Sequence, residues 1–408
     1  MRFTWFIAQR IIGQRSYRSS VSGPIITIGI IAIALGVITM LIALGTGVGL
    51  QQKIGQKVAA FSGHIRVTTL ENSQRQETLK PLEDAQIIQT TLRKQTQVTA
   101  VQSVAYVPGV ILNQNAFDGI VFKGIDDSFN AEFFTFFGDS DAVTTLGAQD
   151  IWISADLAKK LALTIEDRVS LYFASEETAM PKRRSCTVVG LFTTGFLDYD
   201  NTYVLGHLDV VSSLYGWENN QVGAFEIFVE DDADLSIQSE VLYDSIDALV
   251  DVQHIEEQFP EIFNWIRLFG TNISLIIIIM IIVGGVNMIT ALLVLILEQT
   301  QLIGITRVMG ATVGSLQQLF LIQGAYLIGV GLFWGNLIGL GLLYAQQQTG
   351  FISLDPSTYY VNKVPVYMDL TTVLWLNGGT LLVCLALLIL PSFIIARIAP
   401  TQALKINP

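Results

Sequence analysis

Charge is scarce in this sequence, and it is missing altogether from four long stretches. Charged residues make up 14% of the 408 residues, whereas an ordinary soluble chain has about a quarter. The uncharged stretches are residues 19–52, 268–297, 308–354 and 370–396. Each is long enough for a helix to cross the hydrocarbon core of a bilayer, which needs roughly 20 apolar residues. The scarcity of charge therefore excludes an ordinary soluble protein and predicts an integral membrane protein.

Cysteine, histidine and the common catalytic motifs are also sparse or missing. Cys186 falls outside the membrane and Cys384 within the last uncharged stretch, so no intramolecular disulfide is expected. His64, His207 and His254 are far apart in the sequence, and we expect structural roles for them. The chain has no H-E-x-x-H, G-x-S-x-G or G-x-x-x-x-G-K-[ST] motif. We therefore expect no enzyme, no metal and no cofactor on this chain, and any ATP to be bound by another.

The four apolar runs predict membrane-spanning helices over 25–48, 271–297, 317–344 and 372–396. Residues 276–283 have no polar face, which suits lipid better than a buried position in a soluble core. A cleaved signal peptide is the alternative for the first run. Its apolar stretch is far longer than the ~7–15 residues of a signal core.

The short flanking segments orient these helices. They carry a clear excess of basic residues: Arg2, Arg10, Arg15, Arg18, Arg307, Arg397 and Lys405. Short basic flanks stay in the cytoplasm. We therefore expect both termini and the loop 298–316 to be cytoplasmic, and residues 49–268 and 345–371 to lie on the other side.

The large outer segment, 49–268, is strongly acidic. It contains 32 of the 35 acidic residues and 15 of the 23 basic ones. An acidic surface argues against a nucleic-acid partner. No turn signal interrupts the first helix until Ser62-Gly63, so we expect this helix to continue beyond the membrane as part of a short stalk.

Strand and helix patterns predict the fold of the outer segment. Both ends, 64–109 and 221–255, show strand–helix–strand patterns, and the insert 110–220 is richer in strands. The predicted fold class is thus an integral membrane protein of four transmembrane helices, with a large α+β periplasmic domain between helices one and two. We expect two subdomains in this domain: a split strand–helix–strand part and a mainly β insert.

Two acidic stretches of the outer segment could be taken for metal sites. Asp198 and Asp200 could bind calcium, but a polar hairpin turn is the simpler interpretation. Residues 231–234 are most simply a solvated turn that leads into a helix N-terminus.

Small and amide residues mark the membrane helices. Gly331, Gly335 and Gly339 recur every four residues on one helix face, a spacing that lets another helix approach closely. A helix that merely tolerates glycine is the alternative. We expect the amides at membrane depth to bond neighbouring helices; they are Asn287, Gln323 and Asn336.

The cytoplasmic loop 298–312 is too apolar for a plain linker. Its apolar side chains need a surface to cover them, and its two glycines can end or bend a short helix. We expect a short helix that is presented to a cytoplasmic partner. A loop lying among lipid headgroups is the alternative.

This segment resembles the corresponding loop of FtsX/MacB-type ABC permeases, with matches at Ile303, Gly304, Ile305, Arg307, Gly310 and Ala311. The end of the last helix matches too, at Pro391, 396–398, Pro400 and 403–405. The resemblance implies that the loop is the coupling helix that docks on a separate ATPase, which binds ATP and magnesium. The implied coupling residues are Glu298, Ile303, Gly304, Ile305, Arg307, Met309, Gly310 and Ala311.

Within this superfamily the chain resembles the LolC/LolE lipoprotein-releasing permeases, at 359–366 and from 188–192 through 203–204. The resemblance implies extraction of lipoproteins from the inner membrane of a Gram-negative bacterium. It also implies four kinds of partner besides the lipid bilayer: a separate ATPase, a second homologous or identical permease, a lipoprotein substrate and a LolA-type periplasmic chaperone.

A hairpin loop recruits the chaperone in this family, and its counterpart here is 174–184. The implied contact candidates are Glu176, Glu177, Met180 and Pro181. An apolar cavity for acyl chains is expected along 30–44 and 275–293.

Three other functions are considered. An FtsX-like signalling permease would transmit ATPase motion to a cell-wall hydrolase without moving a substrate. A MacB-like export subunit would carry its ATPase on the same chain, which this sequence does not. A membrane enzyme has no motif in its favour.

Overall fold

The structure is a computed structural model. It describes residues 22–73, 77–78, 80–113, 116–129, 132–137, 146–174, 180–218, 220–230, 233–246 and 249–393. The chain forms two compact units. The helical domain comprises residues up to Gln51, Ile266–Ser353 and the chain from Lys363 onward. The sheet domain comprises Gln52–Trp265 and Leu354–Asn362.

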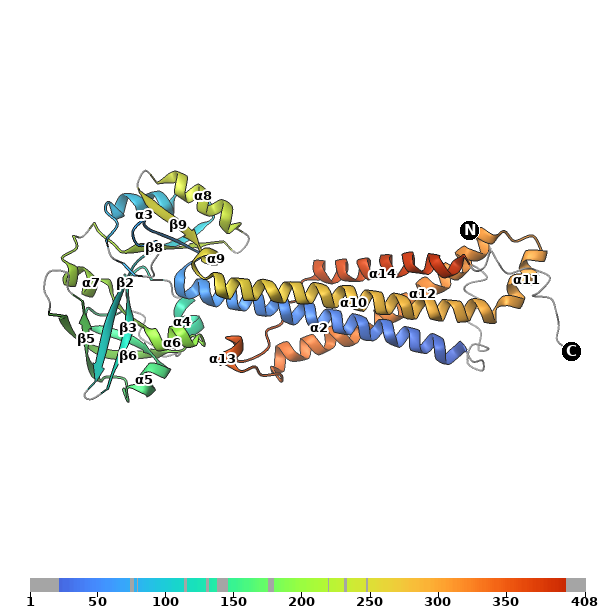
Figure 1. The fold of residues 1–408 in the computed structure, drawn as a ribbon, viewed down its shortest axis with the longest axis horizontal. Coiled ribbons are helices and arrows are strands. Elements are labelled where there is room, and N and C mark those ends of the chain that lie inside the picture. Colours follow the sequence, from blue (N-terminus) through green and yellow to red (C-terminus); the bar gives the residue numbers. More distant parts are fainter. Residues whose placement is uncertain are drawn as a thin grey trace. The chain divides into compact units, whose positions relative to one another are not determined.

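Long helices dominate the ribbon (Figure 1). They are α2 (Ser22–Ser62), α10 (Pro260–Glu298), α12 (Val313–Thr349) and α14 (Leu370–Ser392). Among the described residues, these are the helices long and apolar enough to cross a membrane. The prediction of four transmembrane helices is confirmed. As expected, α2 runs on to Ser62, where Gly63 turns the chain with a left-handed φ of 74°.

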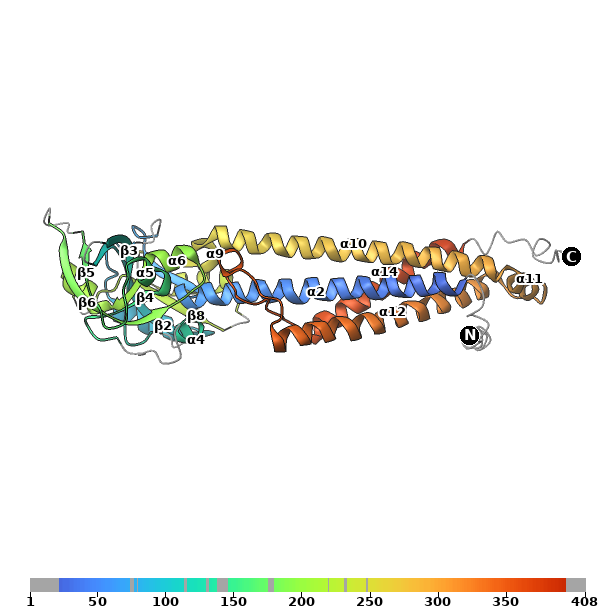
Figure 2. The same ribbon diagram turned by 90° about the horizontal axis from the view of Figure 1, so that it is seen from below.

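Within the helical domain the long helices run side by side (Figures 1 and 2). A short helix, α11 (Thr300–Val308), connects α10 to α12. Buried apolar side chains form a continuous core that includes Met40 of α2, Leu292 of α10, Phe320 of α12 and Leu388 of α14. Ile303 of α11 is part of the same core.

The sheet domain is built on a nine-stranded sheet in the described part of the chain. The strands are β1 (Ile65–Thr69), β2 (Val98–Asn113), β3 (Ala116–Ile125), β4 (Asp150–Ser154), β5 (Arg168–Phe173), β6 (Lys182–Phe192), β7 (Tyr203–His207), β8 (Ala224–Val229) and β9 (Val250–His254). Their order is β3-β7-β4-β6-β5-β2-β8-β1-β9, and β2 also pairs with β3. That extra pairing closes six of the strands into a ring.

The helices of the sheet domain are short. They are α3 (Ala85–Arg93), α4 (Glu132–Phe137), α5 (Ala155–Lys160), α6 (Leu197–Thr202), α7 (Leu208–Tyr215), α8 (Leu235–Ser245), α9 (Ile255–Gln258) and α13 (Pro356–Tyr359). Asp234 accepts hydrogen bonds from Ser236 N and Ile237 N at the start of α8. The expected turn before a helix N-terminus is present there, and Asp231 and Asp232 lie outside the described residues.

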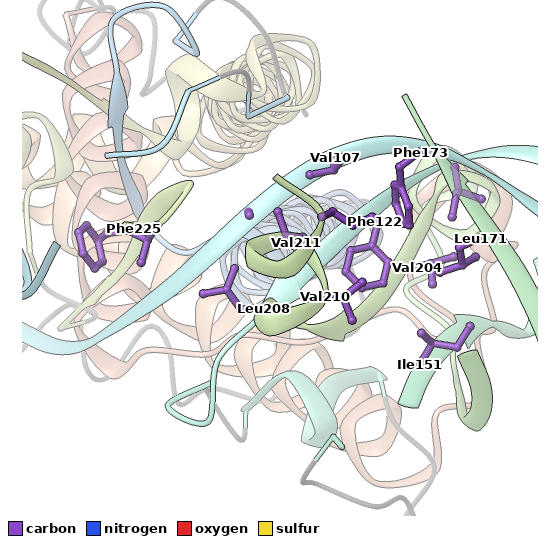
Figure 3. Close-up of a cluster of buried hydrophobic side chains, with 14 of the residues drawn as sticks. Val107, Phe122, Ile151, Leu171, Phe173, Val204, Leu208, Val210, Val211 and Phe225 are labelled. Carbon is purple, nitrogen blue, oxygen red and sulfur yellow. The ribbon is translucent and has the colours of Figure 1, made fainter. Parts of the chain in front are cut away.

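One long strand joins the two groups of strands. The first part of β2 pairs with β8, whereas its second part pairs with β3 and β5. The ring encloses apolar side chains such as Phe122, Leu171 and Val204 (Figure 3). Because one hydrogen-bonded sheet runs through both groups, the division into two subdomains stays a prediction.

The prediction of a polar hairpin turn around Asp198 and Asp200 is wrong. These residues lie in α6, directly before β7. The Asp200 carboxylate is buried, and it accepts hydrogen bonds from Thr194 N, Thr194 Oγ1 and Gly195 N at 2.8–2.9 Å. Burial is the largest influence on this group and raises the pKa of Asp200. A carboxylate surrounded by donors organises the preceding turn.

Candidate coupling site

The segment between α10 and α12 folds into a short helix with defined ends. After α11, Ala311 N donates to Thr306 O at 3.0 Å and Gly310 N donates to Arg307 O at 3.1 Å. These two bonds make a Schellman motif, which requires a left-handed residue after the helix. Gly310 supplies it with φ 97°. Thr312 then caps the start of α12 by accepting from Ser315 N. Gly310 therefore ends the helix, as the sequence suggested.

The expected coupling residues divide between two faces of this segment. Ile303 and Gly304 are buried, whereas Arg307 and Ala311 are half-buried. Glu298, at the end of α10, is exposed, as is Gly310. The apolar side chains of Ile305, Val308 and Met309 are 42%, 64% and 72% exposed. Residues three and four apart lie on one helix face. One side of α11 is therefore anchored in the helical core, and the other presents an apolar surface.

The small residues of α12 face α2. An added Cβ at Gly331, Gly335 or Gly339 would lie within 3 Å of Ile33, Val37 or Leu41, respectively. At Gly335 it would also lie 3.0 Å from the backbone oxygen of Ala34. Such contacts bring the two helix backbones close together.

The amides of the membrane helices behave in two ways. Asn336 of α12 and Asn377 of α14 exchange side-chain hydrogen bonds of 2.6 and 2.9 Å. The expected inter-helix bond is therefore confirmed for Asn336. Gln323 is 1% exposed, and neither of its side-chain polar atoms has a hydrogen-bond partner in the described structure. For Gln323 the prediction of a bonded amide is wrong, because apolar side chains such as Leu292 and Leu388 surround this part of α12. The inter-helix bond of Asn287 stays a prediction.

A buried ion pair lies where α2 ends inside the sheet domain. Lys123 of β3 and Glu226 of β8 are completely buried, and Lys123 Nζ lies 2.9 Å from both carboxylate oxygens. Gln102 and Tyr106 of β2 donate to the same carboxylate. Lys123 Nζ also donates to the carbonyl of Phe61, in the last turn of α2. This network anchors the C-terminal end of α2 to the sheet.

The network shifts the acidity of its members through burial. Burial is the largest influence and lowers the pKa of Lys123, against the opposing attraction of Glu226. Burial likewise raises the pKa of Tyr106 well above its ordinary value, and the Glu226 charge adds to the rise. Sequence reasoning missed this network. The available signal was Glu226, the one charged residue of β8, together with Lys123 among the apolar residues that end β3.

The expected chaperone loop connects β5 and β6, whose pairing ends at Phe173 and Lys182. It is therefore a hairpin loop, as the resemblance implied. Met180 is 80% exposed and Pro181 is also exposed. Glu176 and Glu177 lie outside the described residues.

None of the histidines lies in a group that could hold a metal ion within the described ranges. His64 Nδ1 accepts from Val229 N, and His207 Nδ1 accepts from Asp209 N at the start of α7. His254 lies 3.5 Å from Glu257. Their contacts are those of structural side chains.

Two family models match this chain. Residues 26–242 match the MacB-like periplasmic core domain, and residues 274–400 match the FtsX-like permease C-terminal domain. The periplasmic region of MacB from Actinobacillus actinomycetemcomitans matches 49% of this chain and 92% of its own, with 12% identity and a TM-score of 0.34.

Curated relatives align over nearly the whole chain. The lipoprotein-releasing system transmembrane protein LolC of Neisseria meningitidis is 20% identical over 395 residues, covering 93% of each protein. LolC of Haemophilus influenzae is 22% identical over 399 residues, covering 92% of each. The larger family model alone spans more than half of the sequence, and the second continues through the last three long helices. The chain therefore belongs to the FtsX/MacB-type ABC transporter permeases, in which a MacB-like periplasmic core domain precedes an FtsX-like permease domain.

Proposed function

We propose that this chain is the permease subunit of a transporter that extracts lipoproteins from the inner membrane and passes them to a periplasmic chaperone. A separate ATPase, which binds ATP and magnesium, drives the extraction, and a second homologous or identical permease completes the assembly. Both termini and α11 lie in the cytoplasm, where the basic flanks favour them. The similarity to LolC proteins over about 93% of the chain supports this assignment.

The observation that carries the proposal is the exposed apolar face of α11. Ile305, Val308 and Met309 lie on a short helix whose other face is buried, with Ile303 in the core of the helical domain. An apolar patch of this kind marks a protein contact when it lies outside lipid. An ATPase that binds it and then moves would pull on a segment already anchored in the helical core.

Extraction of acyl chains requires an energy source such as ATP hydrolysis. Each CH₂ group removed from the bilayer into water costs about 0.8 kcal/mol, so one long chain costs on the order of 10 kcal/mol. An apolar surface that keeps the chain covered lowers this cost.

Two helix faces offer such a surface. On α2 the exposed side chains include Ile28, Ile31, Leu35 and Ile42; on α10 they include Leu275, Ile278, Ile279, Ile282, Val283 and Val286. Both sets recur at helical spacing and so form continuous apolar stripes. They overlap the segments 30–44 and 275–293, where the sequence suggested an acyl-chain cavity. We assign these stripes to contact with acyl chains or with the second permease.

The test is transfer of an acylated lipoprotein from proteoliposomes to soluble chaperone. The full chain, its ATPase and any second permease are reconstituted together, and ATP-dependent transfer is expected. Val308→Asp should weaken ATPase binding and transfer by at least about tenfold, because a charge replaces an apolar contact. Ile237→Asp is the matched control, because Ile237 is similarly exposed on α8 of the sheet domain.

Two outcomes would contradict the proposal in different ways. Normal transfer by Val308→Asp would remove α11 from the coupling contact. No transfer by the unmodified chain, with ATP hydrolysis intact, would reject lipoprotein release and favour an FtsX-like signalling permease.

A further inference from the structure

The loop between α12 and α14 is shared between the two domains. Its central part, Leu354–Asn362, belongs to the sheet domain, although both flanking helices belong to the helical domain. The chain therefore crosses between the domains four times: once along α2, once at the start of α10, and twice through this loop. We call residues 350–369 the outer loop.

Within the sheet domain, Lys57 joins the outer loop to a turn of the sheet. Lys57 lies on the outer part of α2, and its Nζ donates to Thr194 O and to Tyr360 O, both at 2.9 Å. Burial is the main influence on this side chain and lowers its pKa, followed by the nearby charge of Lys53. A partly buried ammonium with two carbonyl acceptors ties three separate chain segments together.

The ring of Tyr360 adds an aromatic contact to the same junction. It stacks on Phe196 with ring centroids 4.6 Å apart and planes inclined by 22°, and it meets Trp265 edge-on at 6.0 Å. Tyr360 has a φ of 60°, in the left-handed region that bulky residues avoid. Such a conformation persists only where surrounding contacts impose it. The docked ring is therefore what keeps this backbone in place.

The turn that receives Tyr360 is itself rigid. The Asp200 carboxylate holds Thr194 and Gly195 through three hydrogen bonds. Gly195 adopts a φ of 79°, and an added Cβ there would lie 3.4 Å from both Lys57 Nζ and Tyr360 O. The turn is thus shaped to accept both the lysine and the loop.

Within the helical domain, the second half of the outer loop packs along α2. Tyr367 N donates to Gly45 O at 2.9 Å. A Cβ added at Gly49 would lie 2.7 Å from Pro365 O and 2.9 Å from Tyr367 N, both backbone atoms. Only glycine leaves room for the loop at this position. The outer loop is therefore bound to α2 in each domain, by Gly49 in one and by Lys57 in the other.

We propose that the outer loop is a third mechanical connection to the sheet domain, which makes the movement of that domain depend on α12 and α14 as well as on the stalk helices. Lys57, Phe196, Tyr360 and Gly49 are its positioning residues. This inference rests on the proposed function, in which ATPase motion enters through α11 and must reach the periplasmic side. A loop that merely joined two helices would need neither the strained Tyr360 nor the glycine contact at position 49.

The experiment compares two matched pairs of variants in the full chain with its ATPase. Tyr360→Gly accepts the left-handed backbone but removes the ring, whereas Tyr360→Phe keeps the ring contacts. Gly49→Ala forces the outer loop away from α2, whereas Gly55→Ala changes the same helix where no atom lies within 4 Å of the added Cβ. The first member of each pair is the test and the second is the control.

The primary measurement does not depend on cargo. Hydrogen exchange at the amides of Thr194 and Gly195 is compared between the nucleotide-free and the vanadate-trapped complex. The unmodified chain and both controls should show a nucleotide-dependent change in rate of at least about fivefold. Tyr360→Gly and Gly49→Ala should reduce that change to less than twofold, with unchanged basal ATP hydrolysis.

The second measurement is the number of lipoproteins transferred per ATP hydrolysed, which should fall at least about fivefold in both test variants. A nucleotide-dependent exchange change that survives in Tyr360→Gly and Gly49→Ala would overturn the connection. A different result would separate the two proposals. If the unmodified chain shows the nucleotide-dependent exchange change, both test variants lose it, and no lipoprotein is transferred, the proposed function is overturned while the connection is supported.

Discussion

One buried polar group of the sheet domain and one of the helical domain have opposite surroundings. In the sheet domain, every acceptor of Glu226 is occupied by Lys123, Gln102 or Tyr106. In the helical domain, the amide of Gln323 is equally buried and has no hydrogen-bond partner among the described residues. The difference concerns how firmly the packing around each group is specified. A fully bonded network specifies one arrangement, whereas an unpaired buried amide leaves the packing around it open to rearrangement.

The largest effect is expected from separating the buried ion pair. Lys123→Met leaves the Glu226 carboxylate buried without its cation, which should lower the free energy of unfolding of the sheet domain by about 3–5 kcal/mol. Chemical unfolding of the purified chain, followed by a signal from the sheet domain, measures the loss. Lys80→Met is the control, because both side chains of the Lys80–Glu71 pair are exposed and the pair should contribute less than about 1 kcal/mol. If both substitutions lowered the free energy of unfolding equally, the buried ion pair would be no more important for stability than the exposed one.

A smaller loss is expected at the contact between α2 and α12. Gly335→Ala places a methyl group against Val37 and the backbone of Ala34, and overpacking of this kind costs about 1–3 kcal/mol. Gly341→Ala on the same helix meets no atom within 4 Å and should gain helix propensity instead. Thermal unfolding in detergent compares the two variants. If Gly335→Ala proves as stable as Gly341→Ala, the close helix contact is not needed.

Replacing the unpaired amide should stabilise the helical domain. Gln323→Leu removes two polar atoms that have no hydrogen-bond partner in the described part of the chain, and leaving such a group buried costs about 1–3 kcal/mol. Asn336→Leu should act in the other direction, by roughly 0.6 kcal/mol, because it breaks the bond to Asn377. The same thermal unfolding measurement gives both signs. A loss of stability in Gln323→Leu would show that a bound group or a partner satisfies this amide.

The smallest effect concerns the reactivity of a single thiol. Burial raises the pKa of Cys186 to about 11, so little thiolate exists at pH 8 and alkylation should be at least about tenfold slower than for an exposed cysteine. The rate should rise as the pH approaches that value, since only the thiolate reacts. Mass spectrometry of the Cys186 peptide after timed iodoacetamide treatment follows the reaction. Fast labelling at pH 8 in the folded chain would show that the interior of the sheet domain opens readily.

The sequence allowed more to be predicted about the membrane part than about the sheet. Uncharged runs are long and unambiguous, so the four long helices could be located from composition alone. The strands were harder, because β4 and the helices α6 and α7 lie in short segments with mixed patterns. The parallel pairing of β3 with β7 and of β4 with β6 joins strands far apart in the chain, and no local signal indicates it.

The candidate site was predictable only where its signal was local. The glycine that ends α11 and the excess of apolar residues around it are contiguous in the sequence, so the coupling helix could be expected. The Lys123–Glu226 pair joins residues 103 positions apart, and the contact of Lys57 with Tyr360 joins residues 303 positions apart. Each of these residues, taken alone, is an ordinary member of a strand, a helix or a loop.

By itself, the sequence determined that the chain has four long apolar helices and an acidic α+β domain between the first two. Hydrophobicity and charge are properties of the residues themselves, and lipid selects helices wherever an uncharged run is long enough. Only the tertiary structure decided that the loop between α12 and α14 belongs partly to the sheet domain, that six strands close into a ring, and that the Gln323 amide is buried among apolar side chains. These features depend on which distant surfaces meet, and packing geometry rather than local composition determines that.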